Sequence, residues 1–146
     1  MLNISNYVSF DLAKRLREMG LDILCVAHYD NSGVFHFNQI EEGFDIDITD
    51  ILRSYNSELT YNLIDAPTIS DVIDWLFVEH DLHIQTYPYT GVDGHTSFGY
   101  TVTDIYTREQ RVLSDDTEDK DLYTFNVLAK TKAIECALEM LKERNI

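Results

Sequence analysis

The spacing of the apolar residues changes from helical to strand-like near Asp81, and this change constrains the fold most. Residues 68–80 open with Thr68-Ile69-Ser70-Asp71, which resembles a capping box, and continue with apolar residues at helical spacing. Residues 83–89 then alternate with period two. The sequence therefore predicts a helix followed at once by a strand. We expect Trp75 on the flank of the helix, beside a buried stripe of Ile69, Val72, Ile73 and Leu76.

A return strand follows the alternating run. Pro88 is typical of an edge strand or a strand end, and Gly91 with Asp93-Gly94 indicates a turn. Apolar residues and threonines alternate again from Phe98, and this strand can extend to Tyr106. Together these signals predict an antiparallel hairpin.

The first third of the chain predicts another helix and hairpin. Ser9 is a good N-cap and Gly20 a typical stop for an amphipathic helix. Residues 21–29 form a β-rich run, and a turn cluster at 30–33 separates it from residues 34–37. In such a hairpin His28 and His36 face each other.

The remaining segments are predicted less uniformly. Residues 44–48 alternate and indicate a strand, residues 49–55 favour a short helix over a continued strand, and residues 59–64 suggest an extended piece. An acidic loop at 114–121 precedes a long final helix, which either Asp121 or Thr124 could cap. Helices interleaved with antiparallel hairpins predict an α+β fold, with three main helices packed on the hairpins.

The chain of 146 residues suits one domain, residues 1–146, because a domain of this size buries roughly 70% of the surface of its unfolded chain. Cys25 and Cys136 lie in apolar and helical patterns that favour reduced thiols. No run approaches the ~20 apolar residues that span a bilayer, and no basic start precedes an apolar stretch. We therefore expect a soluble, cytoplasmic protein without a cofactor.

Charge gives the strongest functional direction. The net charge is -15, which disfavours direct binding to nucleic acid and to anionic lipid. No lysine or arginine occurs between Arg53 and Arg108, whereas eight carboxylates do. A field of one sign selects partners with basic surfaces. We expect the interaction surface to include acidic and aromatic residues, namely Asp45, Asp47, Asp74, Trp75, Glu79, Tyr87 and Tyr89.

Three segments carry a resemblance to other proteins. They are Ser9-Phe10-Asp11-Leu12-Ala13-Lys14-Arg15-Leu16 through Gly20, Ala66-Pro67-Thr68 leading to Trp75-Leu76, and His83-Ile84. Their order resembles a group of small uncharacterised proteins from gut bacteria and their phages, in which an N-terminal helix, an Ala-Pro-Thr-type helix with a Trp, a hairpin and a C-terminal helix recur. The resemblance implies this architecture and a phage or mobile-element context, and it brings no catalytic residues.

The most metal-like cluster comprises His80, Asp81 and His83, since imidazole and carboxylate groups suit zinc or manganese. Asp93 and His95 can join it if the hairpin folds back over the end of the helix. Its spacing matches no sharp zinc motif, and solvated surface histidines are the commoner interpretation. The aspartates at 45, 47 and 50 and the acidic run at 115–121 lack the glycine and distal glutamate of a calcium loop.

The leading interpretation is a noncatalytic interaction protein that binds a host or phage protein, and a narrower version is a nucleic-acid mimic. The alternative is a small metal-dependent hydrolase that uses the His80, His83 and His95 region. A further alternative is an oligomeric accessory protein that pairs through Tyr87, Tyr89 and the hairpin at 83–106. The sequence leaves catalysis open, although no coherent catalytic constellation favours it.

Overall fold

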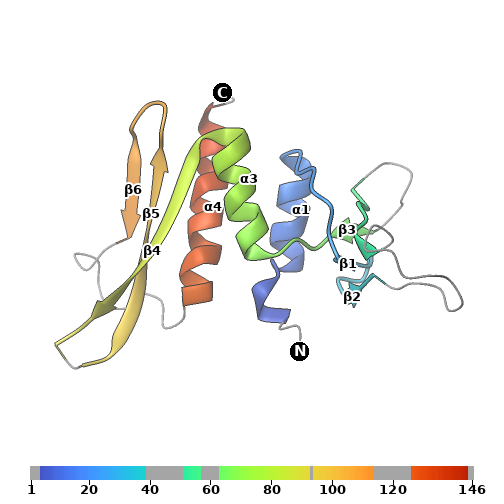
Figure 1. Ribbon diagram of the computed structural model, residues 1–146, viewed down its shortest axis with the longest axis horizontal. Helices are drawn as coiled ribbons and strands as arrows, with labels where there is room; N and C mark the ends of the chain where they lie inside the picture. Colours follow the sequence, from blue (N-terminus) through green and yellow to red (C-terminus); the bar gives the residue numbers. More distant parts are fainter. Residues whose placement is uncertain (1–3, 39–50, 57–62, 93, 114–125, 145–146) are drawn as a thin grey trace, which may run out of the picture. The chain divides into compact units, whose positions relative to one another are not determined.

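The computed structural model describes residues 4–38, 51–56, 63–92, 94–113 and 126–144 (Figure 1). The chain divides into two compact units, residues 1–68 and 69–146. Both units combine helices with antiparallel strands, which confirms the predicted α+β class. The prediction of one domain over residues 1–146 stays a prediction, and each unit is described by itself.

The first unit begins with a 3-10 helix, η1 (Ile4–Asn6), and with α1 (Phe10–Glu18). The hydroxyl of Ser9 accepts a hydrogen bond from the amide of Leu12 at 3.2 Å, as expected of an N-cap. Gly20 ends the helix at φ +87°, where the absence of a Cβ removes the steric cost of the left-handed region. The predicted start and stop of this helix are confirmed.

The sheet of the first unit has the order β2-β1-β3 and is antiparallel. Its strands are β1 (Ala27–Tyr29), β2 (Phe35–Phe37) and β3 (Ile64–Asp65). The predicted hairpin is confirmed, and its strands are shorter than the apolar runs that indicate them. The phenol of Tyr29 donates a hydrogen bond to the carbonyl oxygen of Val8 at 2.5 Å, which ties the sheet to the segment before α1.

The second unit contains α3 (Ile69–His80), β4 (Leu82–Thr90), β5 (Thr96–Asp104), β6 (Gln110–Leu113) and α4 (Asn126–Arg144). The strands form an antiparallel sheet of order β4-β5-β6 (Figure 1). Helix α4 contacts β4, β5 and α3, and α3 also contacts β4. The predicted helix and hairpin are confirmed, and Pro88 lies on an edge strand as expected.

The core of the second unit is built where the sheet meets α4. Leu82, Ile84 and Val102 are buried on the strands, and one side of the helix is almost fully buried, comprising Ala129, Ala133, Ile134, Ala137 and Leu138. The small alanine side chains let the helix backbone approach the sheet closely. Branched side chains then fill the remaining space.

Several expectations differ from the structure. Trp75 is buried at 7% exposure, whereas Ile73 is only half-buried, so the buried stripe of α3 is rotated from the predicted one. The second strand of the hairpin ends at Asp104, and β6 was not predicted. The short helix predicted at 49–55 is wrong from Leu52 onward: of its described residues only Ile51 is helical, because the backbone of Arg53 pairs with that of Cys25 through hydrogen bonds of 2.9 and 3.0 Å. The strand at 44–48, residues 49–50, most of the extended piece at 59–64, the acidic loop and the cap of the final helix lie outside the described residues.

No helix in the part of the chain that the structure describes is long and apolar enough to cross a membrane. Cys25 and Cys136 are free thiols, as the sequence predicts.

Candidate functional site

The structure does not bring the predicted metal-binding histidines into one site. The ring of His80 contacts Trp75 edge-on at 4.6 Å between centroids, and the ring of His83 contacts Phe77 at 5.9 Å. His95 is exposed near the turn between β4 and β5, and Asp93 lies outside the described residues. Among the residues with described positions, no group of three or more His, Cys, Asp or Glu side chains could hold a metal ion.

The carboxylates between Arg53 and Arg108, from here on the cation-free stretch, are divided between the surface and the interior. Asp71, Asp74, Glu79 and Asp81 are exposed, whereas Asp65 and Asp104 are 1% and 3% exposed. Glu58 and Asp93 lie outside the described residues, as do Asp45 and Asp47 of the predicted interaction surface. The two buried aspartates cannot contribute to an acidic surface, so a continuous row of carboxylates along this stretch is not formed.

Asp65 is held in the first unit by three local hydrogen bonds. Its carboxylate accepts from the hydroxyl of Ser54 at 2.9 Å and from the amide of Tyr55 at 2.7 Å, while its own amide donates to the side chain of Asn56 at 3.0 Å. Burial raises the pKa of the Asp65 carboxyl, and these hydrogen bonds and nearby His28 only partly offset that rise. Asp65 therefore ties residues 54–56 to β3, which is a structural role.

The face of the second sheet that points away from the core carries no lysine, arginine, aspartate or glutamate among its described residues, and its one histidine is His83. Leu82, Ile84 and Val102 point inward, so alternate residues of each strand point outward. These outward residues, from here on the outer face, are His83, Gln85, Tyr87, Tyr89, Ser97, Gly99, Thr101, Thr103, Gln110 and Val112. Two predicted interaction residues, Tyr87 and Tyr89, lie on it.

The remaining predicted interaction residues belong to α3. Asp74 and Glu79 are exposed, and two apolar neighbours, Phe77 and Val78, are also exposed at 47% and 71%. Trp75 is buried and offers little area to a partner. The acidic residues and the tyrosines thus lie on different elements.

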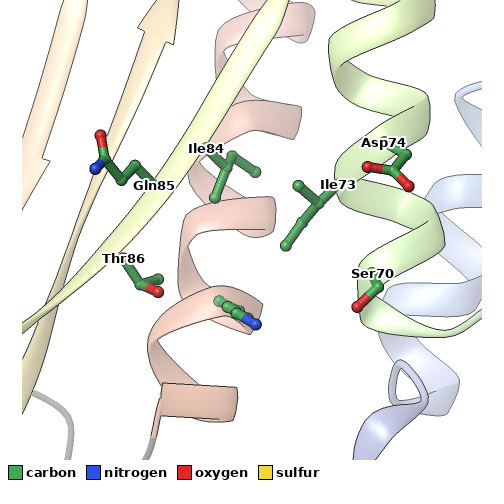
Figure 2. Close-up of a pocket in the computed structure, with 7 residues that line it drawn as sticks. Ser70, Ile73, Asp74, Ile84, Gln85 and Thr86 are labelled. Atoms are coloured by element: carbon green, nitrogen blue, oxygen red, sulfur yellow. The ribbon is translucent and has the colours of Figure 1, made fainter.

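A groove of about 310 Å³ runs between α3, β4 and α4 (Figure 2). Ile73 and Ile84 point toward each other across it, and Ser70, Asp74, Thr86 and Lys130 supply polar groups. Its carboxylate and its ammonium group have opposite charges, so the groove presents no strong field of either sign. We assign no ligand to it.

The second cavity, of about 370 Å³, lies in the first unit beside the first hairpin and is lined by His28, Asp30, His36, Phe37 and Tyr55. His28 and His36 are direct partners across β1 and β2, as the sequence predicts. Their rings are stacked, with centroids 5.4 Å apart and planes inclined by 22°, and the ring of Tyr55 lies 4.8 Å from that of His28. The sequence suggested the facing pair but not the groups that surround it.

Comparisons with protein-family models, curated proteins and solved structures give no match for this chain.

Proposed function

We propose that the protein acts by binding another protein, and that the outer face is the binding surface. The observation that carries this proposal is the lack of any lysine, arginine, aspartate or glutamate on the described outer face in a chain of net charge -15. The cores of protein interfaces are depleted in charged residues and enriched in tyrosine. Tyr87 and Tyr89 supply large amphipathic side chains, and the threonines supply hydroxyls for hydrogen bonds across an interface.

A second copy of the same chain fits this surface best. In a two-fold symmetric dimer the same patch lies on both sides, so every charge on it is brought near its own image. A patch of tyrosine, threonine and glutamine meets its image without repulsion. A patch with exposed carboxylates, such as those on α3, repels its image because like charges are brought together. The outer face is thus where two strongly acidic chains can meet at the lowest electrostatic cost.

This proposal keeps the interaction role and moves the contact from acidic residues to the sheet. Binding of a basic partner to Asp74 and Glu79 on α3 is the second candidate, supported by the exposed Phe77 and Val78 beside them. A phage or mobile-element context and a cytoplasmic location belong to the proposal on the strength of the sequence resemblance and composition. The hydrolase alternative finds no support in the separate ring contacts of His80 and His83.

Light scattering on the purified full chain at increasing protein concentration tests the dimer. We expect the mass to rise from one chain to two, and we expect Thr101→Glu to keep the chain monomeric because each copy then places a carboxylate at the centre of the face. Asn126→Glu adds the same charge at an exposed position of α4 and should leave dimerisation unchanged.

A monomer at every concentration, or a dimer that Thr101→Glu does not weaken, would overturn the outer-face dimer. Circular dichroism confirms that each variant is folded. A partner captured from lysate by the wild type and lost between low and moderate salt would instead favour the acidic surface of α3, because screening weakens contacts between opposite charges.

A further inference from the structure

We propose that His28 and His36 form a binding site for a divalent transition-metal ion, with one imidazole nitrogen from each residue as the ligand. The two residues are direct cross-strand partners, with stacked rings beside a cavity of about 370 Å³. The proposal is independent of the outer face, which belongs to the other unit.

The hydrogen bonds around His28 fix which of its nitrogens carries the proton. The side-chain amide of Asn38 donates to the carbonyl oxygens of Cys25 at 2.8 Å and Ile51 at 2.9 Å. These two acceptors orient the amide, so its oxygen must face His28 Nδ1, which lies 2.7 Å away. His28 Nδ1 therefore donates, and the lone pair of the neutral ring is on Nε2.

An equivalent arrangement fixes the proton of His36. Asp30 Oδ1 accepts from the amides of Ser32 at 2.8 Å and Val34 at 3.0 Å, and Asp30 Oδ2 lies 2.9 Å from His36 Nε2. A carboxylate has no proton to give, so Asp30 can only accept from the ring. His36 Nε2 donates, and its lone pair is on Nδ1.

This pattern is the one that metal-binding histidines show. A ligating imidazole almost always donates its second N–H to a carboxylate, carbonyl or water, which fixes the ring and makes the ligating nitrogen more basic. Here each ring has such an acceptor, Asn38 Oδ1 for one and Asp30 Oδ2 for the other. A tetrahedral ion with bonds of about 2.0 Å needs ligand nitrogens roughly 3.3 Å apart, so binding requires the two stacked rings to adjust within the freedom that their N–H···O hydrogen bonds leave.

The surroundings favour a cation of borderline softness. The residues that line the cavity include no lysine or arginine, and the carboxylate of Asp30 lies at its wall. Imidazole nitrogen suits Zn²⁺, Ni²⁺ and Cu²⁺, whereas Mg²⁺ and Ca²⁺ prefer oxygen. No three His, Cys, Asp or Glu side chains among the described residues converge on one point, so the chain supplies two ligands and water completes the coordination. Binding should therefore be reversible and weaker than at a closed structural zinc site.

Titration of the untagged full chain with Zn²⁺ tests the site, with affinity measured by calorimetry and the ring nitrogens followed by ¹H–¹⁵N NMR. We expect Zn²⁺ to shift His28 Nε2 and His36 Nδ1, to leave His83 and His95 unchanged, and to bind where Mg²⁺ does not. His28→Gln and His36→Gln should each abolish this binding, whereas His83→Gln should not.

Asp30→Asn provides the sharper test. The new amide oxygen can keep the two backbone hydrogen bonds, but its NH₂ group faces His36 Nε2 and forces the ring proton onto Nδ1, the proposed ligand. We expect zinc affinity to fall about 10- to 100-fold, while Asp22→Asn, which removes the same charge at an exposed position, leaves it unchanged. The proposed site is wrong if wild type, Asp30→Asn and His28→Gln bind zinc with equal affinity. It is also wrong if zinc shifts the signals of neither ring in folded wild-type protein.

Discussion

Arg144 donates a hydrogen bond of 2.5 Å to the carboxylate of Asp104, and the two residues are 40 positions apart in the chain. The same guanidinium donates to the carbonyl oxygen of His80 at 2.9 Å, at the end of α3. Asp104 also accepts hydrogen bonds from the amides of Tyr106 and Thr107. One cation from the last turn of α4 thus joins the ends of α3, β5 and α4 and neutralises a carboxylate of the cation-free stretch.

Arg144→Met should destabilise the protein by about 2 kcal/mol, because a nearly buried carboxylate loses a charged hydrogen-bond donor while its two backbone donors remain. Urea unfolding followed by circular dichroism measures this change. Lys142→Met removes a cation from the same exposed end of α4 and should change the free energy of unfolding much less. Equal effects of the two substitutions would contradict the structural role of Arg144.

Asp65→Asn should be neutral or stabilising at pH 7. The pKa of Asp65 is raised in the folded state, chiefly by burial, so ionisation of this group opposes folding above that pKa. Asparagine can accept from the amide of Tyr55 and donate to the hydroxyl of Ser54 without carrying a charge. The advantage of the variant should shrink as the pH falls through the raised pKa, when wild-type Asp65 also becomes neutral.

Asp104→Asn should show the opposite pH dependence. Burial tends to raise the pKa of Asp104, but the hydrogen bonds from Thr107, Arg144 and Tyr106 outweigh it and lower the pKa overall. The ionised group therefore stabilises the fold above its unfolded pKa, and this contribution is lost as the pH falls through the lowered folded pKa. Unfolding curves of Asp65→Asn and Asp104→Asn at several pH values measure how the stability of each variant depends on pH. Parallel pH profiles for the two variants would show that these pKa directions are wrong.

Gly33→Ala should destabilise the protein more than Gly20→Ala. Both glycines have positive φ, +84° and +87°, so alanine at either position incurs a left-handed cost of about 1–2 kcal/mol. At Gly20 an added Cβ meets no atom within 4 Å, whereas at Gly33 it lies 3.1 Å from Cδ1 of Phe10. Thermal unfolding of the two variants measures the difference, and equal losses would mean that the Phe10 ring moves aside freely.

Trp75 fluorescence should report the protonation of His80. Trp75 is the only tryptophan in the chain, and its ring centroid lies 4.6 Å from that of His80. Burial is the main cause that lowers the pKa of His80, and the positive charge of Arg144 adds to it. We expect the emission to change with a midpoint below the ordinary histidine value of about 6.5. The transition should be absent in His80→Gln and unaffected by His95→Gln.

Local patterns predicted several elements because the interactions that form them are local. The cap at Ser9, the stop at Gly20 and the switch to alternation after residue 81 depend on neighbours within a few positions. The cross-strand pairing of His28 with His36 follows from the turn between their strands. Strand β6 was missed because it has only 4 residues. It is defined by its pairing with β5, which its own sequence does not reveal.

The candidate sites depended more on long-range contacts. The sequence grouped His80 with His83, but their rings contact Trp75 and Phe77 respectively. Asn38 and Asp30 gave no sequence signal as partners of histidines, because their roles depend on how β1, β2 and residue 51 meet.

The sequence by itself determined the α+β class, two antiparallel hairpins, the helices and the excess of negative charge, since composition and short-range periodicity specify these. Only the tertiary structure decided which aspartates are buried, which sheet face lacks lysine, arginine, aspartate and glutamate, and which acceptors orient His28 and His36. These properties arise between residues distant in the chain, where burial and hydrogen-bond geometry, rather than residue type, set the charge and protonation state of each group.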